Sequence, residues 1–273
     1  MIDAPRTYHD LLPGGPSQGW EPVTGGESGA AVFRSADGSR YAKCVPADPA
    51  ALRELEAERD RVAWLAGQGV PGPRAVDWRV RGFAACLVTS AVPGVPADRL
   101  SADRLAAAWG RIADAVRKLH ALPVSECPFE RGLGRMFELA RDVVARGAVE
   151  ADFLPEEQRD MPPAELLARL VPQLDQRIAQ EAATAVVCHG DLCLPNIVLD
   201  PETLDVNGFI DLGRLGRADP YADISLLLAN ARETWPDEER ARAADEEFAE
   251  RYGVVLDRER QRFYLHLDPL TWG

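Results

Sequence analysis

The order of the elements predicted in the first ninety residues constrains the fold more than any other feature of this 273-residue chain. Five short segments have the composition of strands, and an amphipathic segment between the third and the fourth has apolar residues at helical spacing. A turn signal at 36–39 joins the second and third strands into a hairpin. The predicted strands are 20–24, 31–34, 40–45, 75–80 and 83–89, and the predicted helix is 52–65. This order predicts an antiparallel sheet accompanied by one helix.

The chain changes character after a stiff, proline-rich segment at 91–96. Beyond it apolar residues recur mostly at helical spacing, beginning with one face of a long helix from Leu105 to Leu119. Further helices are predicted at 136–144, 164–181, 221–230, 237–252 and 257–267, and short buried strands at 185–188, 197–199 and 208–210. We therefore predict an α+β protein with an N-terminal lobe (1–90), a linker (91–96) and a mainly helical C-terminal lobe (97–273).

The composition is that of a soluble globular protein, with 46% hydrophobic and 27% charged residues. No run of about 18 apolar residues is present, so no membrane-spanning helix is predicted. The first fifteen residues lack the apolar core of a signal peptide. These features predict a cytoplasmic protein with no membrane partner, and we expect a monomer.

The five cysteines do not suggest a disulfide framework, because they are odd in number and widely spaced. Cys188 and Cys193 flank His189, which resembles part of a metal site. No second Cys/His pair completes the four ligands that structural zinc requires, so we expect free thiols.

The formal net charge of −13 bears on the choice of partners. Binding to nucleic acid depends on lysine and arginine neutralising phosphates, so an acidic surface disfavours that function. An acidic surface attracts cations. Solubility alone explains the same charge, which therefore only supports other arguments.

A glycine-rich segment at 25–30 lies in the predicted turn between the first two strands. Glycines allow the backbone to approach a phosphate and to point N–H groups at it, although most glycine-rich turns are only turns. The segment is not a Walker A loop, because no Gly-Lys-Ser/Thr sequence follows. The candidate nucleotide-binding residues here are Gly26, Ser28 and Gly29.

Lys43 lies in the third predicted strand, one hairpin beyond this segment. A strand lysine can simply face solvent, but a lysine that binds the α- and β-phosphates of ATP needs a carboxylate to orient it. The following helix supplies Glu54, Glu56 and Glu58. We choose Glu58 because it lies beside the apolar face of that helix, and we expect the other two to be solvated.

The most specific signal lies in the second half of the chain. Asp191 ends a His-Gly-Asp sequence after the apolar run at 185–188, and Asn196 follows five residues later. Asp211 ends the apolar run at 208–210. Phosphoryl transfer needs a carboxylate near the attacking hydroxyl and oxygen ligands for magnesium. We therefore predict Asp191 as the base and Asn196 and Asp211 as magnesium ligands.

With these motifs the chain resembles the aminoglycoside phosphotransferases from Trp20 onward, most clearly in the His-Gly-Asp loop and at 209–216. The resemblance implies a two-lobed protein-kinase-like fold that uses ATP and Mg²⁺. It implies that Lys43 and Glu58 form the phosphate-binding pair and that Asp191 is the catalytic aspartate. Further implied roles are adenine binding through the backbone of Ser90 and Val92, a structural brace at Asp223 and a structural histidine at His189.

The substrate expectation also rests on this resemblance, since the family binds polycations with carboxylates. The candidates for substrate binding are Glu157, Asp160 and Asp268. The ending 268–273 lacks the second acidic residue of the neomycin and kanamycin enzymes and is similar to that of the streptomycin 3″-phosphotransferases. The expected reaction is transfer of the ATP γ-phosphate to the 3″-hydroxyl of streptomycin, which would give antibiotic resistance.

Other functions remain open. A kinase for another aminoglycoside or for a choline-like metabolite would use the same motifs. A protein kinase is disfavoured, because only residues 212–220 separate Asp211 from the next predicted helix, where a long activation segment would be required. A non-catalytic nucleotide-binding scaffold is disfavoured because Lys43, Asp191, Asn196 and Asp211 are all present.

Overall fold

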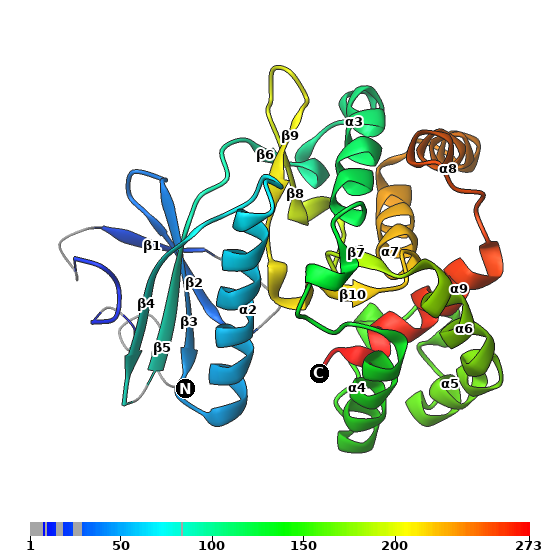
Figure 1. Cartoon of the computed structure of the whole chain (residues 1–273), viewed down its shortest axis with the longest axis horizontal. Helices are drawn as coiled ribbons and strands as arrows, with labels where there is room; N and C mark the ends of the chain where they lie inside the picture. The colour runs from blue at the N-terminus through cyan, green and yellow to red at the C-terminus, as the bar shows by residue number, and fades with distance from the viewer. Residues whose placement is uncertain (1–7, 9, 15–18, 24–28, 83) are drawn as a thin grey trace. The chain divides into compact units, whose positions relative to one another are not determined.

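The computed structural model describes residues 8, 10–14, 19–23, 29–82 and 84–273 (Figure 1). The chain forms two compact units, one made of residues 1–94 with 207–213 and the other of residues 95–206 with 214–273. The first unit ends inside the segment that we expected to link two lobes, and it includes a later segment that the sequence had not assigned to it. None of the helices in these described ranges is long and apolar enough to span a membrane.

The first unit contains a five-stranded sheet in the order β1-β2-β3-β5-β4. Every pair of neighbouring strands is antiparallel, as predicted. Each predicted strand is present with its ends shifted by at most one residue within the described part of the chain. The strands are β1 (Trp20–Val23), β2 (Ala31–Ser35), β3 (Arg40–Pro46), β4 (Ala75–Arg81) and β5 (Ala84–Ser90).

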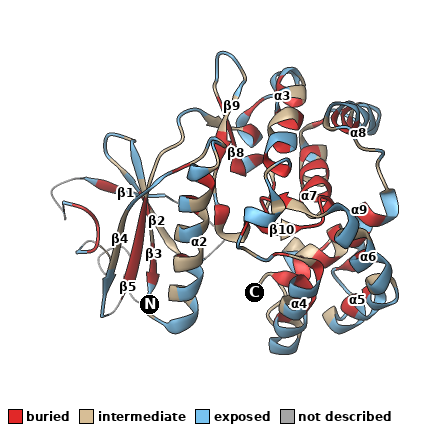
Figure 2. Ribbon diagram, viewed as in Figure 1, coloured by how far each residue is buried: buried red, intermediate tan, exposed pale blue. Residues whose placement is uncertain are grey.

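The helix α2 (Pro49–Gly67) covers one face of this sheet. It begins where the Asp48 carboxylate accepts hydrogen bonds from two backbone N–H groups of its first turn. Its buried Leu55 packs with Val45 of β3 and Leu87 of β5. Most of β5 is buried (Figure 2), because its alternate residues Cys86 and Val88 pack on the opposite face. Two apolar faces therefore fix the register of the central strands.

The second unit is mainly helical, as expected. Its predicted helix at 164–181 is wrong as a single element, because Val171–Gln173 forms a 3₁₀ turn that separates two helices. Pro172 within that turn has no N–H for an α-helical hydrogen bond. The helices are α3 (Ala102–His120), α4 (Leu133–Arg146), α5 (Pro163–Leu170), α6 (Leu174–Thr184), α7 (Tyr221–Ala231), α8 (Glu238–Tyr252) and α9 (Arg258–Leu267).

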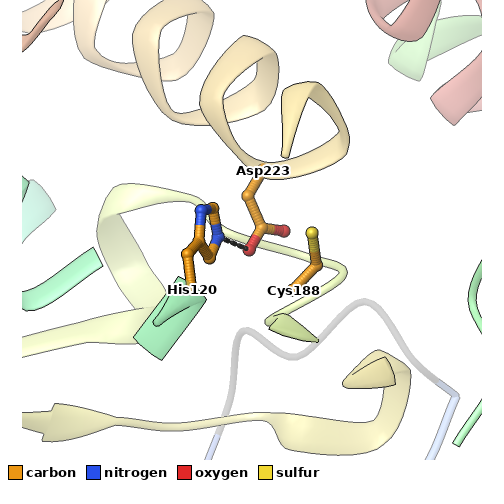
Figure 3. Close-up of side chains that lie close together, drawn as sticks. All are labelled: His120, Cys188 and Asp223. Atoms are coloured by element: carbon orange, nitrogen blue, oxygen red, sulfur yellow. Dashed lines mark hydrogen bonds and ion pairs between the residues drawn. The ribbon is translucent and has the colours of Figure 1, made fainter. Parts of the chain in front are cut away.

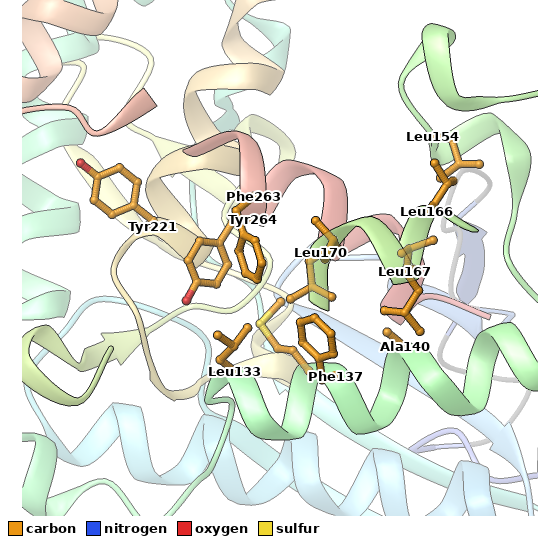
Figure 4. Packing of buried hydrophobic residues seen from close by; sticks show 13 residues of the cluster. Leu133, Phe137, Ala140, Leu154, Leu166, Leu167, Leu170, Tyr221, Phe263 and Tyr264 are labelled. Atoms are coloured by element: carbon orange, nitrogen blue, oxygen red, sulfur yellow. The ribbon is translucent and has the colours of Figure 1, made fainter. Parts of the chain in front are cut away.

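The core of this helical unit joins helices that are distant in the sequence (Figure 4). Leu133 and Phe137 of α4 pack with Leu170 of α5 and with Phe263 and Tyr264 of α9. The rings of Phe137 and Phe263 are stacked with centroids 6.3 Å apart.

The remaining strands are short, and they pair with segments that lie far along the chain. β7 (Val186–Cys188) is antiparallel to β10 (Gly216–Ala218), with Cys188 opposite Gly216. β6 (Val95–Pro96) is antiparallel to β8 (Ile197–Leu199). β9 (Val206–Phe209) follows and leads the chain into the segment 207–213 of the first unit. Asp191 and Asn196 lie in the segment between β7 and β8, and Asp211 follows β9.

Candidate active site

Lys43, Glu58 and Asp211 come together in the first unit. Lys43 is two residues from Val45 in β3, so its side chain lies on the sheet face that α2 covers. Its Nζ lies 2.8 Å from Glu58 Oε2 and 3.4 Å from Asp211 Oδ1. The strand β3 and the helix α2 therefore bring together Lys43 and Glu58, the two residues predicted to pair.

Electrostatics favours a charged Lys43. Burial opposes its charge, but the carboxylates of Glu58 and Asp211 outweigh burial and hold the pKa of Lys43 above its usual value. Burial also raises the pKa of Glu58, and Lys43 counteracts part of that rise. We favour the ionised pair, because a contact of 2.8 Å is a charge-assisted hydrogen bond.

Asp211 follows β9 in a strained backbone conformation. Its φ of 59° lies in the left-handed region, which residues other than glycine seldom adopt. Upstream, Phe209 N–H donates to the carbonyl of Pro71 at 3.2 Å. A Cβ on Gly208 would lie 3.0 Å from Gly72 Cα, so the two backbones approach too closely for side chains. Strain held in place by such packing is common at functional sites.

The loop after β7 holds the predicted base in the second unit. Gly190 has a φ of +84°, and a Cβ on it would lie 2.2 Å from the carbonyl oxygen of Arg214. Asn196 Nδ2 donates to the carbonyl of Asp191 at 2.9 Å and to its Oδ2 at 3.1 Å. Asp191 N–H donates to His189 Nδ1 at 3.2 Å. The structure thus brings Asp191, Asn196 and His189 together in one loop.

Asp223 at the start of α7 binds the backbone of this loop. Its Oδ2 accepts from His189 N–H at 2.6 Å and its Oδ1 from Gly190 N–H at 2.8 Å. Its Oδ2 also lies 3.0 Å from Nε2 of His120, whose Nδ1 contacts the hydroxyl of Tyr252 at 2.7 Å. Burial alone would raise the pKa of Asp223, but its hydrogen bond with His120 and the surrounding donors lower it. Asp223 is therefore an ionised brace for the loop.

His120, Cys188 and Asp223 form a compact buried group (Figure 3). Their potential ligand atoms all lie within 4.8 Å of one another, as a metal site would require. The Asp223 oxygens already accept the hydrogen bonds described above, however, and burial raises the pKa of the Cys188 thiol well above its ordinary value. A neutral thiol is a weak metal ligand. We therefore interpret the group as structural.

The remaining nucleotide candidates lie in the first unit. Ser90 ends β5, and its N–H donates to the carbonyl of Arg74 at 2.9 Å, so only its carbonyl could serve adenine. Val92 lies two residues beyond it and is partly exposed. Gly29 has a φ of +65°, which suits a glycine turn. Gly26 and Ser28 lie outside the described residues.

The three predicted substrate carboxylates differ in their surroundings. Asp268 is held between two groups, with Arg131 Nη2 at 3.7 Å from Oδ1 and Trp272 Nε1 donating to Oδ2 at 3.2 Å. Glu157 and Asp160 are exposed, and no recorded contact joins either of them to Asp268. Of the three, Asp268 is the only one that the described contacts hold in place.

Sequence reasoning missed several residues that hold these loops. His120 gave no signal beyond a lone histidine at the end of an apolar helix face. Arg214 gave no signal beyond its place in the motif at 209–216. In the structure its guanidinium donates to Thr271 Oγ1 at 3.0 Å and lies 3.3 Å from the centroid of the Trp272 ring. These contacts link distant segments, which short-range patterns do not report.

The fold is that of the protein-kinase-like phosphotransferases. Comparison with known proteins confirms this assignment of the fold. Residues 19–264 match the phosphotransferase enzyme family, so the chain belongs to that family. The resemblance and the fold class predicted from the sequence are both confirmed, and the chain is an enzyme of the kinase type.

Particular relatives are very similar. The streptomycin 3″-kinase of Streptomyces griseus is 71% identical over 254 residues, which cover 93% of each protein. The aminoglycoside 3′-phosphotransferase of Streptomyces ribosidificus is 42% identical over 96% of this chain and 97% of its own. The solved structure of aminoglycoside phosphotransferase APH(3″)-Id from Streptomyces rimosus has a TM-score of 0.94 and 69% identity with full coverage of both chains. The structure of that enzyme with ADP and streptomycin has a TM-score of 0.92.

Proposed function

We propose that this protein transfers the γ-phosphate of ATP to the 3″-hydroxyl of streptomycin. The observation that carries the chemistry is the ion pair of Lys43 with Glu58 beside Asp211. A lysine held in this way is the phosphate-binding group of kinase-like enzymes. The choice of acceptor is supported by the extensive identity with the streptomycin 3″-kinase. Phosphorylation of the drug would give antibiotic resistance.

Asp191 is the proposed base. Asn196 donates to its Oδ2 and to its backbone carbonyl, which fixes the orientation of the carboxylate. In that position the carboxylate accepts the proton of the acceptor hydroxyl as the hydroxyl oxygen attacks the γ-phosphorus. Asp223 keeps the loop in place through its two backbone N–H bonds.

Asn196 and Asp211 are the proposed magnesium ligands. The Nδ2 group of Asn196 is engaged by Asp191, so its amide oxygen is the atom available to a cation. Asp211 uses Oδ1 toward Lys43 and is half exposed, so Oδ2 is available. Oxygen atoms of this kind suit magnesium, which when bound would neutralise charge on the phosphates of ATP.

The direct test is release of ADP from magnesium-ATP with streptomycin, kanamycin, neomycin, hygromycin or choline as the acceptor. Turnover with streptomycin and phosphorylation of its 3″-hydroxyl, located by NMR, are the expected results. Turnover with kanamycin or neomycin alone would retain the family and reject the proposed acceptor. Turnover with choline alone would make the protein a metabolite kinase.

Replacing Asp191 separates catalysis from binding. We expect Asp191→Ala to lower kcat by about 10²- to 10⁴-fold, the usual contribution of a general base. Calorimetric titration should still detect ADP binding, because Lys43 and Glu58 are unchanged. Exposed Asp175 of α6 provides a matched control, and Asp175→Ala should keep the normal kcat. A near-normal kcat in Asp191→Ala would reject the assigned role.

A further inference from the structure

Arg131 is buried in the second unit without the hydrogen bonds that a guanidinium normally makes. It is 4% exposed, and its Nε and Nη2 atoms are enclosed with no acceptor among the residues that the structure describes. The 3.7 Å from Nη2 to Asp268 Oδ1 is too long for a hydrogen bond. Nη1 is not among the enclosed atoms, so the guanidinium reaches the surface through it. Buried polar groups in this condition require an explanation.

Another buried arginine of the same unit shows what a structural role looks like. Arg260 donates from Nε to Asp219 Oδ2 at 2.8 Å and from Nη2 to Thr184 Oγ1 at 2.7 Å. Its charge and its donors are therefore satisfied by the protein itself. Arg131 has only the loose ion pair with Asp268, so structural support does not account for its guanidinium.

The backbone fixes Arg131 beside the strands that lead to the His-Gly-Asp loop. Its N–H donates to the carbonyl of Arg217 in β10 at 3.0 Å. Its Cβ lies against Gly216, where an added Cβ would approach to 3.0 Å. Gly216 is opposite Cys188, the last residue of β7 before the loop. The side chain is thus anchored next to the loop of the proposed base.

The charged groups around Arg131 include two that are proposed to act on the acceptor. Burial lowers its pKa, while the negative charges of Asp268 and Asp191 act in the opposite direction. Arg131 therefore lies within electrostatic range of both the proposed base and the best-held carboxylate proposed for the acceptor. The positive charge of Arg131 repels the charged groups of a polycationic acceptor. Arg131 can donate to the hydroxyl, ether or carbonyl oxygens of such a molecule.

We propose that Arg131 is a specificity-determining residue that donates hydrogen bonds to neutral oxygens of the acceptor while its charge positions Asp268. The proposal rests on the function proposed above, since it needs an acceptor that is rich in oxygen. Arg131 distinguishes acceptors by their oxygens, whereas the carboxylates select for positive charge.

The test compares calorimetric binding of streptomycin and of ADP to the wild-type protein, Arg131→Gln and Arg131→Lys. Hydrogen bonds to charged groups contribute enough that Arg131→Gln should raise the Kd of streptomycin by roughly ten- to hundredfold. Arg131→Lys keeps the positive charge but loses the planar arrangement of N–H donors of the guanidinium. An intermediate Kd of streptomycin is therefore expected. The Kd of ADP should stay within about twofold of the wild-type value. A loss of affinity that is confined to one ligand indicates a contact with that ligand.

Arg135→Gln is the matched control. It removes the same charge from the exposed surface of α4, where Arg135 pairs with Glu138 at 3.1 Å. The streptomycin Kd of this variant should remain unchanged. Circular dichroism and thermal melting of each variant check the fold, and Arg131→Lys decides the question if Arg131→Gln does not fold.

Two outcomes would overturn the proposal. Tighter streptomycin binding by Arg131→Gln would mean that Arg131 only repels the cationic acceptor. A lower melting temperature with an unchanged Kd in both variants would mean a purely structural role. A wild-type protein that neither binds nor phosphorylates streptomycin would instead reject the proposed function and this inference with it.

Discussion

At the scale of single residues, Gly190 shows that the His-Gly-Asp motif is a steric requirement as well as a chemical one. Its φ of +84° and the 2.2 Å that would separate a Cβ from the Arg214 carbonyl oxygen leave no room for a side chain. The sequence could predict Asp191 from the chemistry of phosphoryl transfer. It could not predict this constraint, because Arg214 lies 24 residues further along the chain.

Gly190→Ala should therefore destabilise the protein and impair catalysis. A left-handed conformation costs residues with a Cβ about 1–2 kcal/mol, and the clash with Arg214 adds to that cost. We expect a lower melting temperature and a reduced kcat, measured by thermal denaturation and the ADP-release assay.

Gly110→Ala supplies the control for this substitution. Gly110 lies inside α3, and an added Cβ would meet nothing within 4 Å. The change should leave kcat intact and stabilise the helix by about 0.5–1 kcal/mol. If Gly190→Ala matched the wild-type protein in both measurements, the steric reading of the motif would be wrong.

At the scale of elements, three helix ends meet around the His-Gly-Asp loop. His120 ends α3, Asp223 lies in the first turn of α7 and Tyr252 ends α8. The hydrogen bonds Tyr252–His120–Asp223 connect these ends to the loop backbone. The sequence predicted the helices from their apolar periodicity and Asp223 from a family resemblance. It gave no sign of His120, since hydrogen bonds between distant helices leave no local pattern.

His120→Ala should loosen the loop without altering either binding site directly. Removing one partner of a buried, hydrogen-bonded carboxylate costs about 1–3 kcal/mol. We expect lower stability and a lower kcat, with the KM values for ATP and the acceptor little changed. Tyr252→Phe removes only the hydrogen bond between Tyr252 and His120, which is further from the loop. It should therefore have a smaller effect in the same direction.

His266→Gln is a suitable comparison, because His266 is a half-buried histidine of α9. Its kcat should equal that of the wild-type protein. Should His120→Ala retain both full stability and full kcat, the loop would not depend on the contact between His120 and Asp223.

Helices and strands were predictable where burial makes apolar residues recur at a regular spacing. They were unpredictable where a strand is short and its partner is distant in the sequence. The alternation in β3 and β5 reports two buried faces, so both strands were found. β10 was missed because it has only three residues, with Arg217 at its centre, and its partner β7 lies 30 residues upstream. The 3₁₀ turn at Pro172 was missed because helical apolar spacing continues on both sides of it.

At the scale of the whole molecule, the net charge of −13 acts on the encounter with substrates. A cationic acceptor is attracted by the summed field of the protein, whereas the phosphates of ATP are not. The sequence alone established this asymmetry, although charge by itself identifies neither ligand. The surroundings of Asp268 could not be predicted in detail, because they depend on Arg131 and Trp272, which are distant from each other in the sequence.

Salt should therefore weaken the use of a cationic acceptor more than the use of ATP. Raising the ionic strength from about 10 mM to about 100 mM shortens the Debye length from about 30 Å to about 10 Å. We expect kcat/KM for streptomycin to fall severalfold, and KM for ATP to stay constant or decrease. Steady-state kinetics at constant free magnesium would measure both. A kcat/KM for streptomycin that does not depend on salt would exclude long-range attraction.

The segment 207–213 has a consequence for synthesis of the protein. It belongs to the first unit, where Phe209 bonds to Pro71 and Asp211 contacts Lys43, but residues 95–206 precede it on the ribosome. At about 5–20 residues per second, that interval lasts on the order of ten seconds. During this time the nascent first unit lacks the partner of Pro71 and one of the two carboxylate partners of Lys43. It becomes complete only after residues 95–206, the larger part of the second unit, have been made, so the first unit cannot finish folding before the second begins to emerge.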